Sequence, residues 1–301
     1  MESDMKMKNL MAMIFLGWAP ASAGAQQGTL LLSELLFQPR SGEAEYVELY
    51  NAADTAVDLG GYHIVRVLHD SLSTHYPLPT YRVGPHEYVV LTRDAASVAA
   101  NYEVKYQQRL LECSLPTYPN DGGSVVLALV DSTVVQRLDY APSMHSRLLR
   151  NKAGVSLERR SFGRDENEAG NWFSASSTSG YGTPGYENSQ STEYLVEEAS
   201  FLFSSDIVSP DGDGYQDCLE IEYRLDDGTL AARVDVVDAR GRLVRRLLNA
   251  DLLGTHGAVG WDGFGLDAQR LPQGQYIVCI DVYNTAGALQ TIRRAVALLY
   301  K

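Results

Sequence analysis

Short runs of β-branched and aromatic residues recur along the chain, and each is bounded by Gly, Pro, Asn or Asp. Within several runs apolar and polar residues alternate, as expected of strands that bury one face. The strands predicted for the first half are 29–37, 45–51, 61–68, 87–92, 124–130 and 133–138. The last two form a hairpin around the turn sequence VDST. Short strands at this spacing are typical of a β-sandwich.

A second β-rich block begins near residue 195. Its predicted strands are 219–225, 231–239, 243–248, 274–284 and 291–300. Gly241, in the sequence DARGR, supplies the positive φ of a hairpin turn. The one predicted helix covers residues 94–102, with Asp94 as its N-cap. The predicted fold class is therefore all-β, with two sandwiches in tandem.

Between residues 166 and 192 the composition changes to Gly, Ser, Thr, Asn and Glu. Low apolar content and many turn formers predict a loop or tail that leads into a linker. Within it, we expect Trp172 to fill the sandwich core and Thr183-Pro184-Gly185 to turn the chain outward. Residues 191–200 fit either a flexible joint or an edge strand, and both interpretations stay open.

Two glutamates in the first block are candidate chemical groups. In EYVELYN, alternation places Val47 and Leu49 toward the core and Glu48 on a polar outer side. One interpretation makes Glu34 and Glu48 a ligand or catalytic pair. The other, which we favour, has both carboxylates accept hydrogen bonds from backbone amides at the sheet edge.

The N-terminus has the pattern of a secretory signal peptide over residues 1–25. Lys6 and Lys8 precede the apolar sequence NLMAMIFLGWAPA, and the small residues AGA precede Gln26. The alternative is a buried N-terminal helix. We expect an exported mature chain without a membrane span, located in the periplasm, at the cell surface or outside the cell.

The net charge of the chain narrows the choice of binding partners. The chain carries a net charge of −13, and residues 26–192 hold 13 Lys and Arg against 19 Asp and Glu. Such a surface repels phosphate backbones, so no nucleic-acid partner is expected.

The three cysteines are Cys113, Cys218 and Cys279. Cys218 and Cys279 are the candidate disulfide pair; the alternative is that all three are small buried hydrophobic residues.

The stretch SPDGDGYQD, residues 209–217, is the densest in both turn formers and cation ligands. In a calcium-loop register the ligands would be Asp211, Asp213, the carbonyl of Tyr215, Asp217 and Glu220. Ser209 replaces the usual first Asp, and the strand that follows excludes a true EF-hand. Two interpretations stay open: a calcium-stabilised loop, or a tight turn whose glycines have positive φ and whose Asp side chains accept backbone N–H groups.

The first block resembles the lamin tail domains of bacterial secreted proteins. The resemblance lies in EYVELYN and VDLGGY, followed in order by GVSLER, NWFSAS and GTPGYENS. It covers residues 28–190 and implies an immunoglobulin-like sandwich. The chromatin association of eukaryotic lamin tails is not carried over, because the basic stripe that phosphate contacts need is missing.

Residues 201–301 resemble the immunoglobulin-like domain of the flagellar hook-capping protein FlgD and its secreted relatives of Bacteroidetes type. The resemblance lies in SPDGDGYQD, VDARGRLVRRL, GWDGFGLDAQRLPQGQYIV and RRAVALL. Some related end domains are sorting signals, so this domain is a candidate secretion module. Residues 191–200 would link it to the first domain.

Signatures of enzymes are missing from the sequence: it has no HExxH, no G-x-S-x-G and no phosphate-binding glycine loop. His145 and Ser146 could pass for a base beside a nucleophile, but an ordinary loop histidine is the favoured interpretation. We therefore predict a non-enzymatic, exported adhesion or scaffold protein that binds a protein or cell-surface ligand. The alternative is a metal-dependent hydrolase, which would have to gather Glu34, Glu48, Asp211, Asp213 and Asp217 in one open site.

Overall fold

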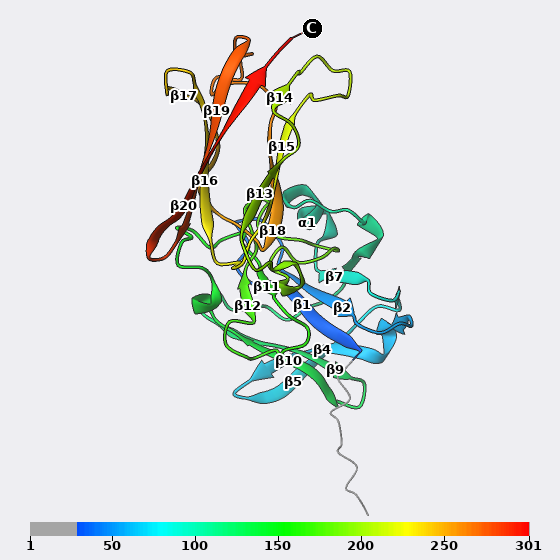
Figure 1. Ribbon diagram of the computed structural model, residues 1–301. Helices are drawn as coiled ribbons and strands as arrows, with labels where there is room; N and C mark the ends of the chain where they lie inside the picture. The colour runs from blue at the N-terminus through cyan, green and yellow to red at the C-terminus, as the bar shows by residue number, and fades with distance from the viewer. Residues whose placement is uncertain (1–28, 301) are drawn as a thin grey trace, which may run out of the picture.

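The computed structural model describes residues 29–300, with the exception of the side chains of residues 288 and 289. The chain forms two β-sandwiches, and the all-β prediction is confirmed (Figure 1). The predicted signal peptide, residues 1–25, lies outside the described residues. No helix within the described part combines the length and apolar character that a membrane span requires.

The first sandwich packs a six-stranded sheet, in the order β12-β11-β1-β2-β7-β8, against a four-stranded sheet, β10-β9-β4-β5. Strands β3 and β6 form a separate two-stranded ladder. The elements are β1 (Leu30–Leu36), β2 (Tyr46–Asn51), β3 (Val57–Asp58), η1 (Leu59–Gly61), β4 (Tyr62–Leu68), β5 (Ser71–Pro77), β6 (Arg82–Val83), β7 (Tyr88–Thr92), α1 (Ala95–Asn101), η2 (Gln107–Arg109), β8 (Leu110–Glu112), β9 (Gly123–Leu129), β10 (Val134–Tyr140), η3 (Pro142–Met144), β11 (Leu157–Arg159) and β12 (Trp172–Ser174).

The core of this sandwich follows from the alternation along its strands. Val47 and Leu49 are fully buried and pack with residues of the opposite sheet such as Val125. Trp172 is 3% exposed in the same core, and its indole N–H donates to the carbonyl of Glu166. The predictions for the core strands and for Trp172 are confirmed.

The second sandwich packs a three-stranded sheet, β13-β15-β18, against a five-stranded sheet, β14-β20-β19-β16-β17. The 3-10 turn η4 (Thr192–Tyr194) precedes it. Its strands are β13 (Ser200–Phe203), β14 (Ile207–Val208), β15 (Leu219–Arg224), β16 (Ala231–Asp238), β17 (Leu243–Leu252), β18 (His256–Trp261), β19 (Gly274–Asn284) and β20 (Gly287–Leu298). Trp261 is the largest fully buried side chain of its core.

Local sequence signals agree with the structure where they rest on one turn or one cap. The Asp94 carboxylate accepts a hydrogen bond from the backbone N–H of Ser97, as an N-cap does. Gly241 has φ +78 in the β16–β17 turn. By contrast, β5 was not predicted, because its seven residues are exposed or half-buried and lack an apolar face. As an edge strand it needs none.

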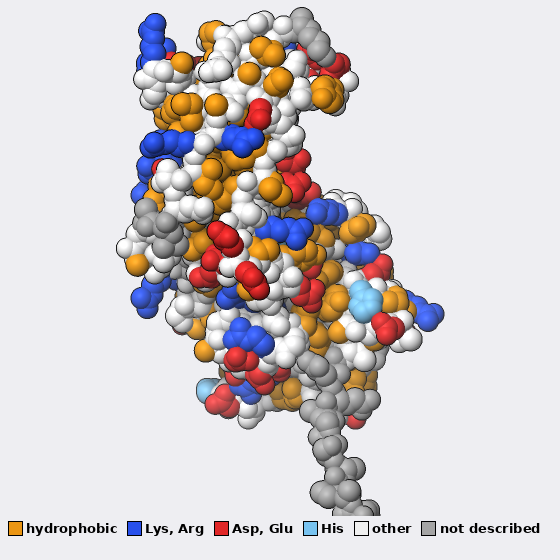
Figure 2. Space-filling view, viewed as in Figure 1, with side chains coloured by type: hydrophobic (Ala, Val, Ile, Leu, Met, Phe, Trp, Pro, Cys, Tyr) orange, Lys and Arg blue, Asp and Glu red, His pale blue; other side chains and the backbone are white. Residues whose placement is uncertain are grey.

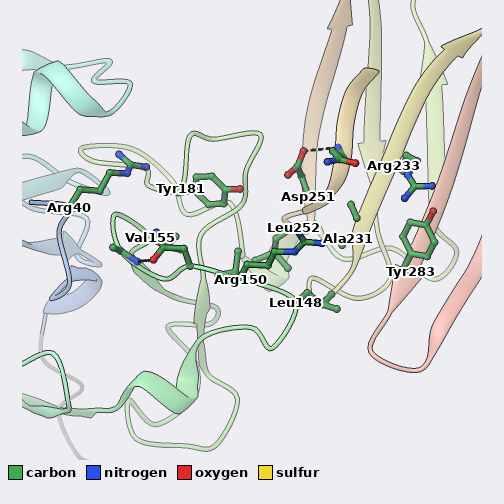
Figure 3. A pocket seen from close by; sticks show the side chains of 15 residues that line it. Arg40, Leu148, Arg150, Val155, Tyr181, Ala231, Arg233, Asp251, Leu252 and Tyr283 are labelled. Carbon is green, nitrogen blue, oxygen red and sulfur yellow. Dashed lines mark hydrogen bonds between the residues drawn. The ribbon is translucent and has the colours of Figure 1, made fainter. Parts of the chain in front are cut away.

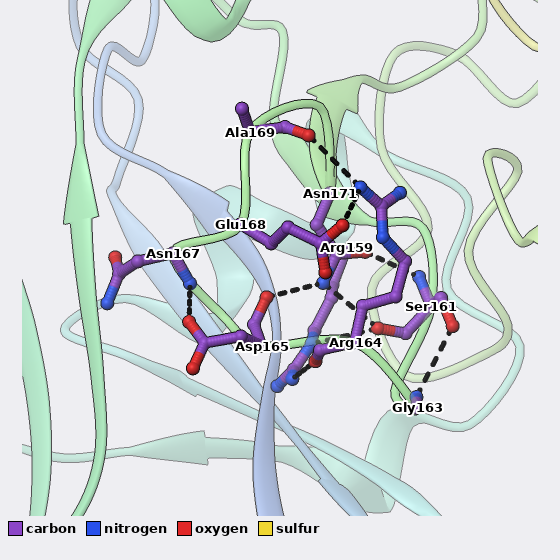
Figure 4. A network of polar contacts seen from close by, with 9 residues as sticks. All are labelled: Arg159, Ser161, Gly163, Arg164, Asp165, Asn167, Glu168, Ala169 and Asn171. Carbon is purple, nitrogen blue, oxygen red and sulfur yellow. Dashed lines mark hydrogen bonds and ion pairs between the residues drawn. The ribbon is translucent and has the colours of Figure 1, made fainter.

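The loop between β11 and β12 is held by polar contacts along its whole length (Figure 4). The Arg159 guanidinium donates to the carbonyl of Arg164 at 2.7 Å, and Arg164 forms an ion pair with Glu168 at 2.8 Å. Asn171 donates through its side chain to the carbonyls of Ser161 and Asp165. This loop therefore has an ordered conformation in spite of its low apolar content.

Residues 181–191, which we call the covering segment, correct the prediction of an outward-turning tail. Most of this segment is buried against the six-stranded sheet. Gly185 does form the predicted turn, with φ +87, but the turn lies over the sheet. Its composition predicted a loop or tail, but the segment is buried because its backbone N–H groups donate hydrogen bonds to carboxyl groups on the sheet. Residues 191–200 contain η4 and the first residue of β13. Within them, the backbone N–H of Val196 donates a hydrogen bond to the carbonyl of Leu225.

The candidate disulfide between Cys218 and Cys279 is not formed, and all three cysteines are free thiols. Cys279 lies on β19 of the five-stranded sheet, whereas Cys218 precedes β15 of the other sheet. Being in one domain therefore did not make these two residues neighbours. Cys113 and Cys279 are half-buried and Cys218 is exposed, so the alternative of three buried hydrophobic residues holds only in part.

Candidate functional site

Three glutamates lie side by side across three neighbouring strands of the first sandwich. Glu34 on β1 is the direct cross-strand partner of both Glu48 on β2 and Glu158 on β11. All three are fully buried. Glu34 and Glu48 were predicted as candidate residues from the sequence, whereas Glu158 was not. The sequence signals for Glu158 were its place in the motif GVSLER and between Leu157 and Arg159 in a short strand.

The covering segment lies over this row of carboxyl groups. Glu34 accepts hydrogen bonds from the backbone N–H of Thr183 at 3.0 Å and from the hydroxyls of Tyr46 and Ser156. The backbone N–H of Gly185 donates to Glu48 at 2.6 Å. The prediction that Glu34 and Glu48 bind backbone amides is confirmed. Their predicted place at the sheet edge is wrong, because β1 and β2 are interior strands.

Glu158 binds the end of the covering segment. It accepts hydrogen bonds from the Ser189 hydroxyl at 2.8 Å and from the backbone N–H of Gln190 at 2.9 Å. The Thr183 hydroxyl donates to it at 2.9 Å. All three glutamates thus bind the covering segment, and Thr183 is shared by Glu34 and Glu158.

The row of carboxyl groups is arranged to hold protons. Burial raises the pKa of all three groups, because it removes water from the charged form. The charge of Glu34 adds to this effect at Glu48 and Glu158, and the pKa of Glu158 reaches about 8. The Oε1 atom of Glu48 is buried without a hydrogen-bond partner. Such a site lacks the open face that a substrate or catalytic water would need.

The end of the covering segment also joins the two sandwiches. The Gln190 side chain donates to the carbonyls of Ser174 in the first sandwich and Leu253 in the second. The Thr255 hydroxyl donates to the carbonyl of Ser191 at 2.7 Å. A Cβ atom at Gly254 would overlap the carbonyl oxygen of Ser189. Close backbone approach and buried hydrogen bonds therefore make this a packed junction.

A second contact lies beside the first. Ser177 donates its backbone N–H and its hydroxyl to the carbonyl of Leu252, at 2.8 Å and 2.7 Å. The hydroxyls of Thr178 and Tyr223 are 2.6 Å apart. The junction therefore uses residues just before the covering segment as well as residues at its end.

The acidic loop 209–217 brings together three of its five candidate ligands. Asp211, Asp213 and Asp217 each offer a carboxylate oxygen, and these oxygens lie within 4.8 Å of one another. Glu220 is not in this group and lies on β15. The remaining candidate ligand is the carbonyl of Tyr215, a residue that is 66% exposed.

Hydrogen bonds fix the conformation of the acidic loop. The two oxygens of Asp217 accept the backbone N–H groups of Gly212 at 2.7 Å and Gly214 at 2.8 Å. Asp213 accepts the N–H of Tyr215 at 2.8 Å. Gly212 and Gly214 both have φ +84, the left-handed conformation that glycine adopts without strain. The prediction of a tight acidic turn is confirmed, and calcium binding stays a prediction.

The acidic loop and the buried glutamates belong to different domains. The loop precedes β15 at the end of the second sandwich that points away from the first (Figure 1). Glu34 and Glu48 lie inside the first sandwich under the covering segment. The structure therefore does not bring together the carboxylates that the hydrolase alternative needs in one site.

His145 and Ser146 are buried next to each other, but their side chains serve different partners. His145 Nδ1 lies 2.8 Å from the Ser174 hydroxyl, and its ring stacks on Phe37. The Ser146 hydroxyl accepts the backbone N–H of Leu148. Burial lowers the pKa of His145 to about 4, so the ring is neutral at pH 7. This geometry is that of a packed core histidine.

No curated protein matches the chain significantly. Among solved structures, dimeric latent PorU from Porphyromonas gingivalis is 9% identical with a TM-score of 0.29, over 94% of this chain and 21% of that chain. PorZ, a surface component of the type-IX secretion system of the same organism, is 10% identical with a TM-score of 0.25, over 89% and 39%.

Exo-chitosanase CsxA from Amycolatopsis orientalis is 16% identical with a TM-score of 0.22, over 86% of this chain and 26% of that chain. The chain thus spans well under half the length of each of these structures, and the likenesses are too distant to indicate a shared activity. Residues 23–142 match the model of the Lamin Tail Domain family, which confirms the predicted resemblance over this range; the later motifs GVSLER, NWFSAS and GTPGYENS lie beyond the match.

Proposed function

We propose that this chain is an exported structural and interaction protein without catalytic activity. In this account its two sandwiches form one rigid unit. The observation that carries the proposal is the use of the buried glutamates. Glu34, Glu48 and Glu158 have no exposed surface. Each accepts a hydrogen bond from a backbone N–H group of the covering segment. Carboxyl groups used in this way stabilise a fold and leave no face for a substrate.

Three sequence features support the finer parts of the proposal. The signal-like residues 1–25 favour export, with a mature chain that begins at Gln26. The lamin-tail match supports a sandwich used as a structural module. The motifs of residues 201–301 favour a domain like that of FlgD, which in some secreted relatives has a sorting role. A protein or cell-surface ligand would then bind to the loops or clefts of this unit.

The acidic loop is proposed as a weak calcium site that rigidifies the far end of the second sandwich. Three carboxylates with oxygens within 4.8 Å of one another, on a turn already fixed by glycines, support this role. With Ser209 in place of a fourth carboxylate, an affinity in the range of extracellular modules is expected, with a Kd of about 0.1–1 mM.

The proposed function is tested by export and by activity. The full chain should be expressed with its own N-terminus in a Gram-negative host. It should then appear outside the cytoplasm with the mass of a chain whose first residue is Gln26. The purified mature chain should not hydrolyse phosphodiester or glycosidic substrates in the presence of Mg²⁺, Mn²⁺, Zn²⁺ or Ca²⁺. Turnover that a chelator abolishes would favour the metal-dependent hydrolase. Retention of the unprocessed chain in the cytoplasm would contradict export.

A further inference from the structure

A cleft of 780 Å³ lies where the two sandwiches meet. Figure 3 shows Arg40 and Tyr181 on the side of the first sandwich, Arg233 and Tyr283 on the side of the second, and Arg150 between them. This volume falls in the range of sites that bind small ligands. Because both domains line the cleft, its shape depends on the packed junction described above.

The cleft has a charge opposite to that of the molecule as a whole. Three arginines and one acidic residue, Asp251, line it, whereas the full chain has a net charge of −13. Figure 2 shows acidic side chains spread over the visible face of both domains, with Lys and Arg gathered along one side of the second. A basic cleft in an acidic protein concentrates anions locally.

Two of the three guanidinium groups have no counter-ion within the described residues. Arg40 forms an ion pair with Glu43 at 3.2 Å, but Arg150 and Arg233 form none. The Nε atom of Arg233 is buried without an acceptor. Asp281, which lies opposite Arg233 in the sheet, accepts a hydrogen bond from the hydroxyl of Thr291. The guanidinium groups of Arg150 and Arg233 therefore line the cleft without a carboxylate partner, and an anion in the cleft would supply one.

The lining also restricts the body of the ligand. The arginines lie on both walls, so a ligand that satisfies them needs negative groups in more than one place. Tyr181 and Tyr283 offer half-buried rings with polar ends, and Asn249 and Asp251 offer hydrogen-bonding groups. Sugar rings with several hydroxyls fit such a mixed lining.

An added peptide strand fits this cleft less well. The edge strand β17 borders the cleft, but Ala250 has φ +60 and the β16–β17 register shifts between Ala232 and Arg233. The backbone groups of β17 are therefore interrupted at the cleft, where a peptide would need a regular edge. We propose that the cleft binds an acidic oligosaccharide whose carboxylate or sulfate groups pair with Arg150 and Arg233.

The test is isothermal titration of the mature chain with four probes of similar length. They are a galacturonate hexamer, a heparin-derived hexasaccharide, neutral maltohexaose and hexaglutamate. We expect saturable binding of one or both acidic saccharides, weakened by added salt, and no binding of maltohexaose. Binding of the first or the second distinguishes carboxylate from sulfate recognition. Preference for hexaglutamate, or no binding of either acidic saccharide, would overturn the inference.

Paired variants assign the binding to the cleft. Arg150→Gln and Arg233→Gln should each weaken binding about tenfold, the loss expected for one charge-assisted hydrogen bond. Arg66→Gln and Arg240→Gln are the controls, since both arginines are exposed and lie outside the cleft. Equal losses in the control variants would overturn the assignment. A thermal melt of each variant excludes unfolding as the cause of a loss.

This inference rests on the proposed interaction function, and the two fail in different ways. Absence of saccharide binding would remove the cleft site and leave the structural role of the two sandwiches intact. If the bound saccharide were cleaved, as mass spectrometry of the titrated sample would show, the cleft site would stand and the non-enzymatic function would be contradicted.

Discussion

At the scale of single residues, Glu158 contributes to the dependence of stability on pH. Its pKa is raised from 4.5 to about 8, so the folded state holds a proton that the unfolded state has released. Its contribution is fully present below pH 4.5 and is lost as pH rises through 8. His145, whose pKa is lowered to about 4, has the opposite effect between pH 4 and 6.5. The effect of Glu158 is therefore clearest above pH 6.5.

We expect the free energy of unfolding to fall between pH 6.5 and 8 by about 1.4 kcal/mol per pH unit for each retained proton. Glu34 and Glu48 act in the same direction. In Glu158→Gln this dependence should be weaker, because Gln keeps the shape but does not ionise. Urea unfolding at several pH values measures it. Equal slopes for the two proteins would contradict a protonated Glu158.

A second residue-scale prediction concerns Asp213 in the acidic loop. In 5 mM Ca²⁺ a site with a Kd of about 0.1–1 mM stabilises the fold by about 1–2 kcal/mol, a rise in Tm of roughly 2–8 °C. Asp213→Asn should lose this rise, since Asn can still accept the Tyr215 N–H but has no charge. Melts with Ca²⁺ and with chelator measure the difference. Superimposable melts of the original protein would reduce the loop to an acidic turn.

At the scale of elements, the contact between the covering segment and the second sandwich depends on Gly254. A methyl group at this position would overlap Ser189, so we expect Gly254→Ala to force the two backbones apart and cost about 1–3 kcal/mol. Gly61→Ala is the matched control, because no atom lies within 4 Å of its Cβ position. Chemical denaturation compares the two variants. Equal stability of both would show that this backbone contact contributes little.

The covering segment also shows where prediction from sequence ends. The core strands and the Asp94 cap follow from local periodicity and local hydrogen bonds, and were predicted. The row of Glu34, Glu48 and Glu158 depends on register between distant strands. Thr183 binds Glu34 across 149 residues of sequence. No local pattern encodes such partners, and a polar, turn-rich stretch therefore predicts a loop or tail that leads into a linker.

In the acidic loop more of the structure could be predicted from the sequence. Its turn was predicted, because glycine conformation and the hydrogen bonds of Asp213 and Asp217 act within a few residues. Of its carboxylate candidates the structure groups Asp211, Asp213 and Asp217 but not Glu220, and calcium binding by them stays a prediction. The basic cleft was not predicted at all, because Arg40, Arg150 and Arg233 come together only when the two sandwiches pack.

At the scale of the whole molecule, the central claim is that the two sandwiches form one rigid unit. The mature chain offers a direct probe, because each sandwich core contains one tryptophan, Trp172 or Trp261. The third tryptophan, Trp18, belongs to the predicted signal peptide. The variants Trp172→Phe and Trp261→Phe therefore each leave a fluorophore in only one sandwich.

The measurement is urea unfolding of both variants, followed at once by tryptophan fluorescence and by far-UV circular dichroism. If the junction couples the domains, fluorescence and dichroism superimpose within each variant, because the chain unfolds in a single cooperative step. If the fluorescence of one sandwich were lost while a large part of the dichroism remained, the two domains would unfold separately, and the claim of one rigid unit would be wrong.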